Sequence, residues 1–336
     1  MNHYMNVRSI AYLKNQLIKS VEHSNTDSLS QIQPKTTSSG RPIRLGLLFF
    51  NPSLRTRLST QIAASELGIE ATVIDTTSQG WPLEFETGSI MNAGTSEHIK
   101  EAVSVLDEYF DILAVRSFEN AKDDAEIANS HSASRDKNGK TSIVQLIKNY
   151  SKRPFVNMES SKQHPLQGLA DIITILENQK TAKPKIVLTW TPHVTNLPTA
   201  VPRSFTEFCK EFGYDLEVAC PKGFEFSVSS DYQVTFNHDQ NSALEGADFV
   251  YAKSWMPSAT NLESKDPKFS NWTIDEQKMG LTKDAYFMHC LPIRRNVVAT
   301  DNVLDSPKCL VTAQAKNRIT AAKIVLSQIS KGLNHV

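Results

Sequence analysis

The chain has 336 residues, of which 40 % are hydrophobic and 21 % are charged, and its 36 basic and 36 acidic residues leave a formal net charge of zero. At roughly 100–200 residues per domain, this length predicts two globular domains, each large enough to bury a core. A zero net charge excludes a global field that attracts nucleic acid or an acidic membrane, so any anion site must be local. No signal segment and no apolar run of about 20 residues is present, so we expect a cytoplasmic protein without nucleic-acid or membrane partners.

Cysteine, histidine and glycine patterns narrow the chemistry further. The cysteines (Cys209, Cys220, Cys290 and Cys309) have no CxxC spacing and the histidines have no HExxH spacing, which argues against a disulfide framework or a zinc site. The sequence also has neither GxxxxGK[ST] nor GxGxxG, the glycine-rich loops of ATPases and dinucleotide-binding proteins. We therefore expect neither a metal nor a cofactor.

Apolar segments of strand length alternate with amphipathic segments of helical length along the chain. The first half predicts strands at residues 44–50, 70–76, 111–118 and 154–159, and helices at 54–68, 96–110 and 164–179. The second half predicts strands at residues 183–190, 214–220, 247–253 and 285–291, and helices at 201–213 and 315–329. Two polar stretches, 24–42 and 129–140, are interpreted as surface loops.

This alternation favours an α/β fold with two doubly wound parallel-sheet domains and a cleft between them, because helices must cover both faces of a parallel sheet. We expect one domain at residues 1–155 and the other at 156–318, with a closing helix at 319–336 that packs back on the first domain. Ligands of such sheets bind beyond the carboxyl ends of the strands. The residues that follow each strand are therefore the candidates for a site.

The first strand ends at Asn51, and the next helix begins at Leu54. Ser53 stands where a helix N-cap belongs, and the free N–H groups of a helix start, together with the positive end of its dipole, can bind phosphate. Arg55 and Thr56 add a guanidinium group and a hydroxyl group in the first turn. The alternative interpretation is an ordinary capped helix with solvated arginines.

Polar residues also follow the third and fourth strands. Arg116 ends the third strand, where a surface ion pair is the alternative to a functional role. Glu159 follows the fourth strand, and His164 and Gln167 open the next helix. The imidazole and the carboxamide are interpreted as two donors to a carbonyl oxygen that becomes negative during nucleophilic attack. The alternative is a helix entry with a solvated histidine.

Cys290 ends the last apolar strand, which Leu291 and Pro292 cannot continue. Its thiol is either a nucleophile or a small buried side chain, and without a clear histidine base burial is favoured. Arg294 and Arg295 follow, and they either meet an anion or face water.

Three motifs, FFNPSLRTR at 49–57, HPLQGLAD at 164–171 and HCLPIRRN at 289–296, resemble the carbamoyltransferase (transcarbamylase) superfamily, and the likeness extends over residues 43–330. The resemblance implies transfer of the carbamoyl group from carbamoyl phosphate, bound by the first domain, to an amine, bound by the second. It implies a carbamoyl-phosphate site formed by Ser53, Leu54, Arg55, Thr56, Trp81, Arg116, His164, Gln167, Cys290, Leu291 and Arg318. Catalytic roles are implied for Arg116, His164, Gln167 and Cys290, with Cys290 acting through its backbone carbonyl group.

Other segments resemble the N-acylornithine branch of this superfamily: GWPLEFETG at 80–88, LTWTPHVTNLPTAVP at 188–202 and YAKSW at 251–255. The Asp-x-x-x-Ser-Met-Gly loop of ornithine carbamoyltransferases is absent from the sequence. The branch implies a knotted loop near 191–202 and a homotrimer with shared active sites, in which Trp81 reaches the site of a neighbouring subunit. It implies an acylornithine site formed by Glu159, His193, Lys253, Arg294 and Ser96.

Two positions bear on the acyl group. Acetyl-type enzymes have a glutamate where this chain has Ser96 and a lysine where it has Val298, whereas succinyl-type enzymes have a proline at the first position. A glutamate would repel the carboxylate of a succinyl group, and a serine does not. We therefore expect N-succinyl-L-ornithine as the acceptor, giving N-succinyl-L-citrulline and phosphate in arginine biosynthesis. The alternatives are N-acetyl-L-ornithine as the acceptor and a non-catalytic paralogue that binds the metabolite.

Overall fold

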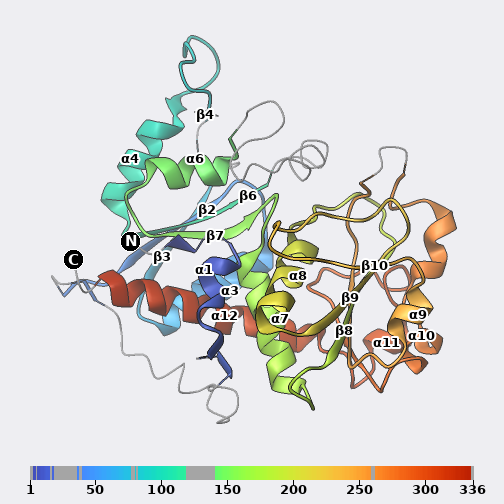
Figure 1. The fold of residues 1–336 in the computed structure, drawn as a ribbon. Coiled ribbons are helices and arrows are strands. Elements are labelled where there is room, and N and C mark those ends of the chain that lie inside the picture. The colour runs from blue at the N-terminus through green and yellow to red at the C-terminus, as the bar shows by residue number, and fades with distance from the viewer. Residues whose placement is uncertain are drawn as a thin grey trace.

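The computed structural model contains two five-stranded sheets, and every strand pairing within them is parallel. The two sheets lie in separate halves of the molecule (Figure 1). This arrangement confirms the predicted α/β fold with two parallel-sheet units. The structure describes residues 3–4, 6–15, 17–18, 36–37, 40–76, 80, 82–118, 141–258 and 262–333.

The first sheet has the strand order β1–β7–β6–β2–β3. Its central strands are buried on both faces, since β6 is buried throughout and β2 at all but its first residue. The strands are β1 (His3–Tyr4), β2 (Arg44–Phe49), β3 (Glu70–Asp75), β6 (Ile112–Ser117) and β7 (Phe155–Ser160). The helices of this unit are α1 (Arg8–Ala11), α3 (Leu54–Glu66), α4 (Ile99–Tyr109) and α6 (Ile143–Tyr150).

The second sheet has the strand order β10–β9–β8–β11–β12. Its central strands β8 and β11 are again buried almost completely, as their apolar runs predict. The strands are β8 (Lys185–Trp190), β9 (Asp215–Ala219), β10 (Phe236–Asn237), β11 (Phe249–Lys253) and β12 (Tyr286–Met288). The helices of this unit are α8 (Ala200–Phe212), α9 (Gln240–Leu244), the 3₁₀ helix η2 (Pro267–Trp272), α10 (Glu276–Gly280) and α11 (Asp301–Leu304).

Two long helices connect the units. α7 (Pro165–Asn178) leads from the first sheet to the second, and α12 (Val311–Leu333) returns from the second unit to the first (Figure 1). α12 packs along both α7 and α3, and Lys323 of α12 pairs with Glu66 of α3 at 2.7 Å. The C-terminal helix therefore holds the first unit to the crossover helix.

Several boundaries differ from those that the sequence predicts. The predicted closing helix is the later part of α12, which begins at Val311. The predicted division between residues 155 and 156 falls inside β7, which pairs along its length within the first sheet, so we propose that the first unit extends at least to Ser160. The helix predicted from residue 96 begins at Ile99, because the preceding residues form β5 (Glu97–His98) beside β4 (Leu83–Glu84).

Three other expectations concern the backbone near 191–202, membrane-spanning helices and the polar stretch at 129–140. The knotted backbone near 191–202 stays a prediction. Within the described ranges, no helix combines the length and the apolar character that crossing a membrane requires. The polar stretch at 129–140 lies outside the described residues.

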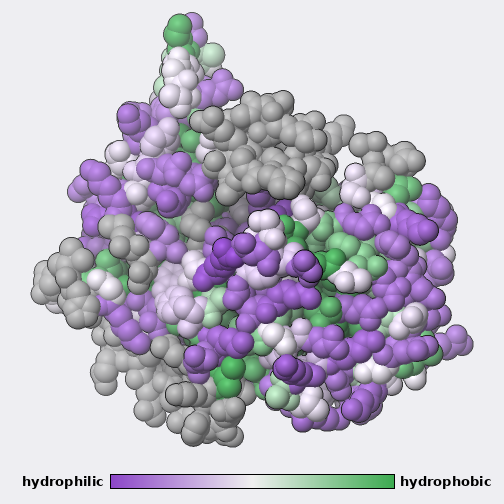
Figure 2. Space-filling model, viewed as in Figure 1, coloured by the Kyte–Doolittle hydropathy of each residue, from purple (hydrophilic) through white to green (hydrophobic). Residues whose placement is uncertain are grey.

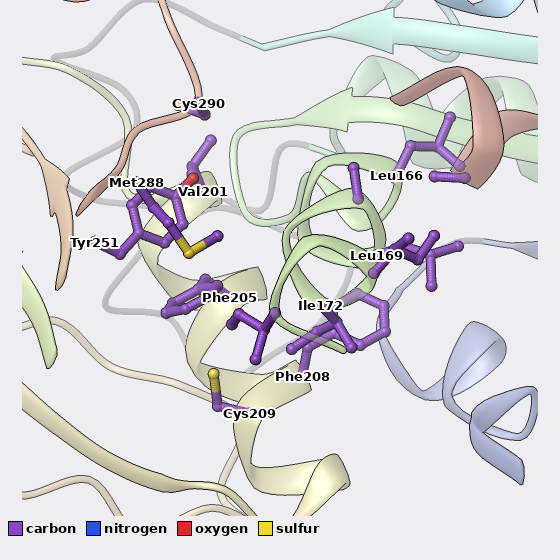
Figure 3. Packing of buried hydrophobic residues seen from close by; sticks show 14 of the residues in the cluster. Leu166, Leu169, Ile172, Val201, Phe205, Phe208, Cys209, Tyr251, Met288 and Cys290 are labelled. Atoms are coloured by element: carbon purple, nitrogen blue, oxygen red, sulfur yellow. The ribbon is translucent and has the colours of Figure 1, made fainter. Parts of the chain in front are cut away.

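Gly168 allows α7 to approach α8 closely. A Cβ atom at this position would lie 2.5 Å from Cδ2 of Phe208 and 3.3 Å from the carbonyl oxygen of Ser204. Around this crossing, Leu169 and Ile172 of α7 pack in the same core as Phe205 and Phe208 of α8 (Figure 3). The close approach also lets α8 position His164 at the start of α7, because the N–H of His164 donates to Oγ of Ser204 at 2.8 Å.

We expect Gly168→Ala to lower the free energy of unfolding by about 1–2 kcal/mol, because a contact of 2.5 Å places the cost in the upper part of the ~1–3 kcal/mol that overpacking a core usually takes. This cost outweighs the ~1 kcal/mol that alanine gains over glycine inside a helix. Urea unfolding of the wild type and the variant measures the difference. Gly94→Ala is the control, because nothing lies within 4 Å of a Cβ atom there. Equal midpoints for Gly168→Ala and the wild type would contradict the close packing.

Candidate active site

The start of α3 is a capped helix N-terminus, as the sequence predicts. The backbone of Ser53 is extended, and its Oγ accepts the N–H of Thr56 at 3.3 Å and contacts Oγ1 of Thr56 at 3.0 Å. The side chain of Leu54 points outward and is 71 % exposed, so this residue can serve a ligand at the helix start only through its backbone. Free N–H groups at such a start favour an anion.

Three arginines gather at this helix start: Arg55 from its first turn, Arg116 from the end of β6 and Arg318 from α12. Burial, followed by the charges of Arg318 and Arg55, lowers the pKa of Arg116. Burial also lowers the pKa of Arg318 to about 10. Arg318 donates through Nη2 to Oγ1 of Thr56 at 2.7 Å and through Nη1 to Oε1 of Gln167. Such a concentration of guanidinium groups suits a phosphate dianion.

A β-bulge places Arg116 opposite Glu159. The register between β6 and β7 shifts after Val115, and a bulge of this kind re-aims the side chains that follow it. Nη1 of Arg116 and Oε2 of Glu159 form an ion pair, and Nε2 of His164 lies 3.2 Å from the same oxygen. Arg116 and His164 therefore converge on one oxygen atom, the carboxylate oxygen of Glu159.

His164 is neutral in this environment. Burial, followed by the charges of Arg318 and Arg116, lowers its pKa well below the ordinary value. Its Nδ1 is buried and has no hydrogen-bond partner among the described residues. Because a neutral imidazole carries a single N–H, Nε2 is the nitrogen placed to donate that hydrogen to the oxygen of Glu159 or to another oxygen in its place.

In the structure two side chains hold the Gln167 amide, and its role as a donor to a carbonyl oxygen stays a prediction. Its Nε2 donates to Oδ1 of Asp171 at 2.7 Å, and its Oε1 accepts from Arg318. The buried carboxylate binds the NH₂ group, so the amide oxygen is the atom turned to the arginine cluster. The amide oxygen can accept a second hydrogen bond, and the NH₂ group keeps one N–H besides the one that it donates to Asp171.

The segment after β12 is held in a fixed turn. Leu291 has φ = +58°, in the left-handed region that leucine rarely adopts. Nδ1 of His289 accepts the N–H of Leu291 at 2.9 Å, and Oε1 of Gln314 accepts the N–H of His289 at 2.8 Å. The side chain of Cys290 is buried and its thiol is free, in agreement with the burial that the sequence favours. These contacts fix the backbone whose carbonyl groups are assigned to the site by resemblance.

Basic residues of the second unit complete the arrangement. Lys253 ends β11 and is buried, which lowers its pKa. Nδ1 of His193 lies 3.0 Å from the carbonyl oxygen of Thr195, and its Nε2 accepts from Nε of Arg294 at 3.3 Å. Burial and, to a lesser degree, the charge of Lys253 lower the pKa of both His193 and His164. The charge of Lys253 therefore acts on the start of α7, and a shared site with His193 and Arg294 stays a prediction.

One predicted site residue, Ser96, is not brought to this group. Ser96 precedes β5, and its N–H donates to the carbonyl oxygen of Pro82 at 2.8 Å. The segment between β4 and α4 projects from the first unit, away from the second sheet (Figure 1). Trp81 lies outside the described residues.

Three residues of the site were missed from the sequence: His289, Gln314 and Asp171. Asp171 had a signal, because it stands four residues after Gln167 on the same face of an otherwise apolar helix. His289 and Gln314 act through hydrogen bonds between the segment after β12 and α12, which no periodic pattern of the sequence reveals.

Together, the fold and the site define a class of protein. Its members have two parallel-sheet units, and the junction of these units suits a phosphorylated ligand at a helix start and an anionic ligand beside it. Residues 6–177 match the carbamoyl-phosphate binding domain of aspartate/ornithine carbamoyltransferase, and residues 194–329 match the aspartate/ornithine binding domain. The chain therefore belongs to the aspartate/ornithine carbamoyltransferase family, as its motifs indicate.

The names of individual relatives also specify the acyl group of the acceptor. The chain is 40 % identical over 334 residues to N-succinylornithine carbamoyltransferase of Bacteroides thetaiotaomicron, covering 99 % of this chain and 100 % of that protein. It is 36 % identical over 306 residues to N-acetylornithine carbamoyltransferase of Xanthomonas axonopodis pv. citri, covering 85 % and 86 % of the two chains. A similar solved structure is an N-acetyl-L-ornithine transcarbamylase variant with one glutamate replaced by serine, in complex with carbamyl phosphate and N-succinyl-L-norvaline. Its TM-score is 0.82 at 32 % identity, covering 98 % of this chain and 100 % of that one.

Inorganic phosphate is expected to stabilise the protein against thermal unfolding, because it binds the arginine cluster only in the folded state. At ten times its Kd the gain is about 1.4 kcal/mol. Arg55→Ala should remove most of the resulting rise in Tm. Arg295→Ala should keep it, because Arg295 is an exposed arginine paired with Asp301 and Asp305. Fluorimetric melting across a phosphate titration measures the effect, and equal shifts in all three proteins would place the anion elsewhere.

Proposed function

We propose that this protein transfers the carbamoyl group of carbamoyl phosphate to the side-chain amine of N-succinyl-L-ornithine, giving N-succinyl-L-citrulline and phosphate. The observation that carries the proposal is the convergence of Arg318 on Thr56 and Gln167, beside Arg116 and His164 on a single oxygen of Glu159. The relative that matches nearly the whole chain bears the name of this activity. The reaction would serve arginine biosynthesis in the cytoplasm.

In this mechanism the phosphate group binds at the start of α3. The N–H groups that follow Ser53, the guanidinium of Arg55 and the hydroxyl of Thr56 supply its contacts. Arg318 adds a buried positive charge beside Thr56. This charge stabilises the negative charge that grows on the leaving oxygen as the bond between carbon and oxygen breaks.

Arg116 and His164 stabilise the carbonyl oxygen. The two side chains already converge on Oε2 of Glu159, so a carbonyl oxygen that uses both donors must take that place, and Glu159 must turn away. The neutral amine attacks the carbamoyl carbon, the carbonyl oxygen gains negative charge, and collapse of the intermediate expels phosphate, which takes the proton that the amine loses. Positioning and electrostatic stabilisation supply the rate, and no residue forms a covalent bond.

The acceptor meets the basic residues of the second unit. N-succinyl-L-ornithine carries two carboxylates, and Lys253 and Arg294 offer cationic partners. Nε of Arg294 donates to Nε2 of His193. The same positive charges disfavour protonation of the attacking amine, which must be neutral to act as a nucleophile.

The succinyl group is supported by two comparisons. The relative of highest identity among those named above is an N-succinylornithine carbamoyltransferase. In the solved N-acetyl-L-ornithine transcarbamylase, the variant with serine in place of a glutamate is complexed with N-succinyl-L-norvaline. This chain has Ser96 at the position where acetyl-type enzymes have a glutamate, so no carboxylate repels a succinyl group there.

Wild-type protein should convert N-succinyl-L-ornithine with a higher kcat/KM than N-acetyl-L-ornithine. Ser96→Glu should lower the ratio of kcat/KM for the succinyl substrate to that for the acetyl substrate at least about tenfold. Two like charges ~4 Å apart repel by ~4 kcal/mol at an effective dielectric of about 20, and ~1.4 kcal/mol of this repulsion is enough for a tenfold effect. A citrulline assay with both acceptors and both proteins measures the ratio. Ser96→Gln is the control, since it adds the same bulk without a charge.

The outcomes separate the alternatives. A ratio that Ser96→Glu leaves unchanged would show that this position does not meet the acyl group. A wild-type preference for N-acetyl-L-ornithine would overturn the acyl assignment and leave the carbamoyl transfer intact. Formation of no citrulline product from either acceptor would favour the non-catalytic paralogue.

A homotrimer with shared active sites is part of this proposal. Leu54, Leu58 and Ile62 form an exposed apolar stripe along α3, at a spacing of four residues. Ile90, which is 83 % exposed, and Met91 lie in the projecting segment, whose tip shows hydrophobic residues (Figure 2). Contiguous exposed apolar side chains of this kind are typical of surfaces that a partner covers. A neighbouring subunit would also explain why Ser96 lies away from the basic residues of its own chain.

Mixing two inactive variants tests the shared site. Trp81→Ala and His164→Asn should each be nearly inactive alone. A randomly mixed oligomer should recover about a quarter of the wild-type activity, because about that share of its sites combines intact His164 with intact Trp81 from the neighbour. Activity is measured after co-refolding or co-expression, with the mixed state verified by mass spectrometry. Mixed oligomers as inactive as their parents would refute the shared site.

A further inference from the structure

Asp171 is a carboxylate in the buried part of α7, where the charge of Arg318 acts on it without a direct ion pair. All residues of α7 from Pro165 to Leu176 are buried, and Asp171 itself is fully buried. Among the described residues, none forms an ion pair with it. Burial raises the pKa of Asp171 to about 6, and hydrogen bonds from Gln314 and Gln167 oppose this shift. An unpaired buried carboxylate is costly, so its retention needs a reason.

The hydrogen bonds of Asp171 connect the two halves of the site. Oδ1 accepts from Nε2 of Gln167 at 2.7 Å and from Nε2 of Gln314 at 2.9 Å. Oε1 of Gln314 in turn accepts the N–H of His289, in the turn that carries Cys290. A single oxygen of Asp171 therefore joins the amide of Gln167 to the backbone that follows β12.

This contact decides which way the Gln167 amide faces. A primary amide can rotate by half a turn and exchange its oxygen and nitrogen. An ionised carboxylate only accepts hydrogen bonds, so Asp171 holds the NH₂ group of Gln167 and turns the oxygen toward Arg318. With the opposite orientation, the NH₂ group would face the guanidinium of Arg318, and two donors would meet.

We infer that Asp171 is a positioning residue, which acts through Gln167 by fixing its amide oxygen as a hydrogen-bond acceptor for the NH₂ group of the carbamoyl substrate. This inference rests on the proposed carbamoyl transfer. Asp171 itself does not touch the substrate. Gln314 gives the carboxylate its second donor and ties its position to the turn at His289.

The test is a double-mutant cycle with Asp171→Asn and Gln167→Ala. Asparagine keeps the shape but offers both a donor and an acceptor, so Arg318 alone still opposes rotation of the Gln167 amide, and kcat should fall about tenfold. KM for the acylornithine should change little, because the contact concerns the carbamoyl group. In the Gln167→Ala background, Asp171→Asn should cause no further loss, since it acts only through the missing amide.

Asp107→Asn is the matched control. Asp107 is a buried carboxylate of α4 that accepts from Oγ of Ser151 and from the N–H of Lys152, within the first unit and outside the site. This variant should lower Tm and leave kcat unchanged. Gln314→Ala gives a second arm, whether or not Asp171→Asn folds. The part of its effect on kcat that acts through Asp171 should vanish in the Gln167→Ala background, and the part that acts through the turn at His289 should remain.

Losses in kcat that add in the double variants would overturn the inference, because a purely structural role lowers activity independently of Gln167. An Asp171→Asn protein with the wild-type kcat would overturn it as well. Failure of the proposed function is distinguishable, since the wild type itself would then form no carbamoylated product.

Discussion

The buried guanidinium of Arg318 is the interaction on which the packing of α3, α7 and α12 depends. A charge taken out of water costs several kcal/mol unless good partners surround it, and Arg318 finds two acceptors where Thr56 of α3 meets Gln167 of α7. Three helices from distant parts of the chain must therefore pack in one way. The anion-binding helix start and the amide beside it take their relative positions from this requirement.

Most of the fold could be predicted from the sequence because its central strands are continuous apolar runs, such as those at residues 44–50 and 111–118. Helices cover both faces of a parallel sheet, so nearly all side chains of its central strands are buried and apolar. The two-residue edge strands β1 and β10 are too short to show any periodicity, and their pairing depends on neighbours distant in the sequence. The start of α4 was misplaced because the pairing of β5 with β4 overrides a helical pattern.

The candidate site could be predicted in part for a topological reason, since parallel strands send the residues that follow them to one edge of the sheet. Arg116 and Glu159 were found in this way. Arg318 came only from resemblance, because nothing near it in the sequence marks a buried arginine. The orientation of Gln167 depends on Asp171 and on hydrogen bonds between side chains of separate helices, which a one-dimensional pattern does not contain.

Glu159 cannot serve two partners at once. While its carboxylate is engaged by Arg116 and His164, it is not available to a nitrogen of the acylornithine. A carbonyl oxygen that takes its place releases the carboxylate toward the second ligand. The two substrates are therefore not bound independently: an acylornithine that arrives first meets a glutamate already in use, and carbamoyl phosphate prepares the acceptor's site by occupying its own. If Glu159 binds the acylornithine as the resemblance implies, the proposed mechanism entails a preferred order of addition, donor before acceptor.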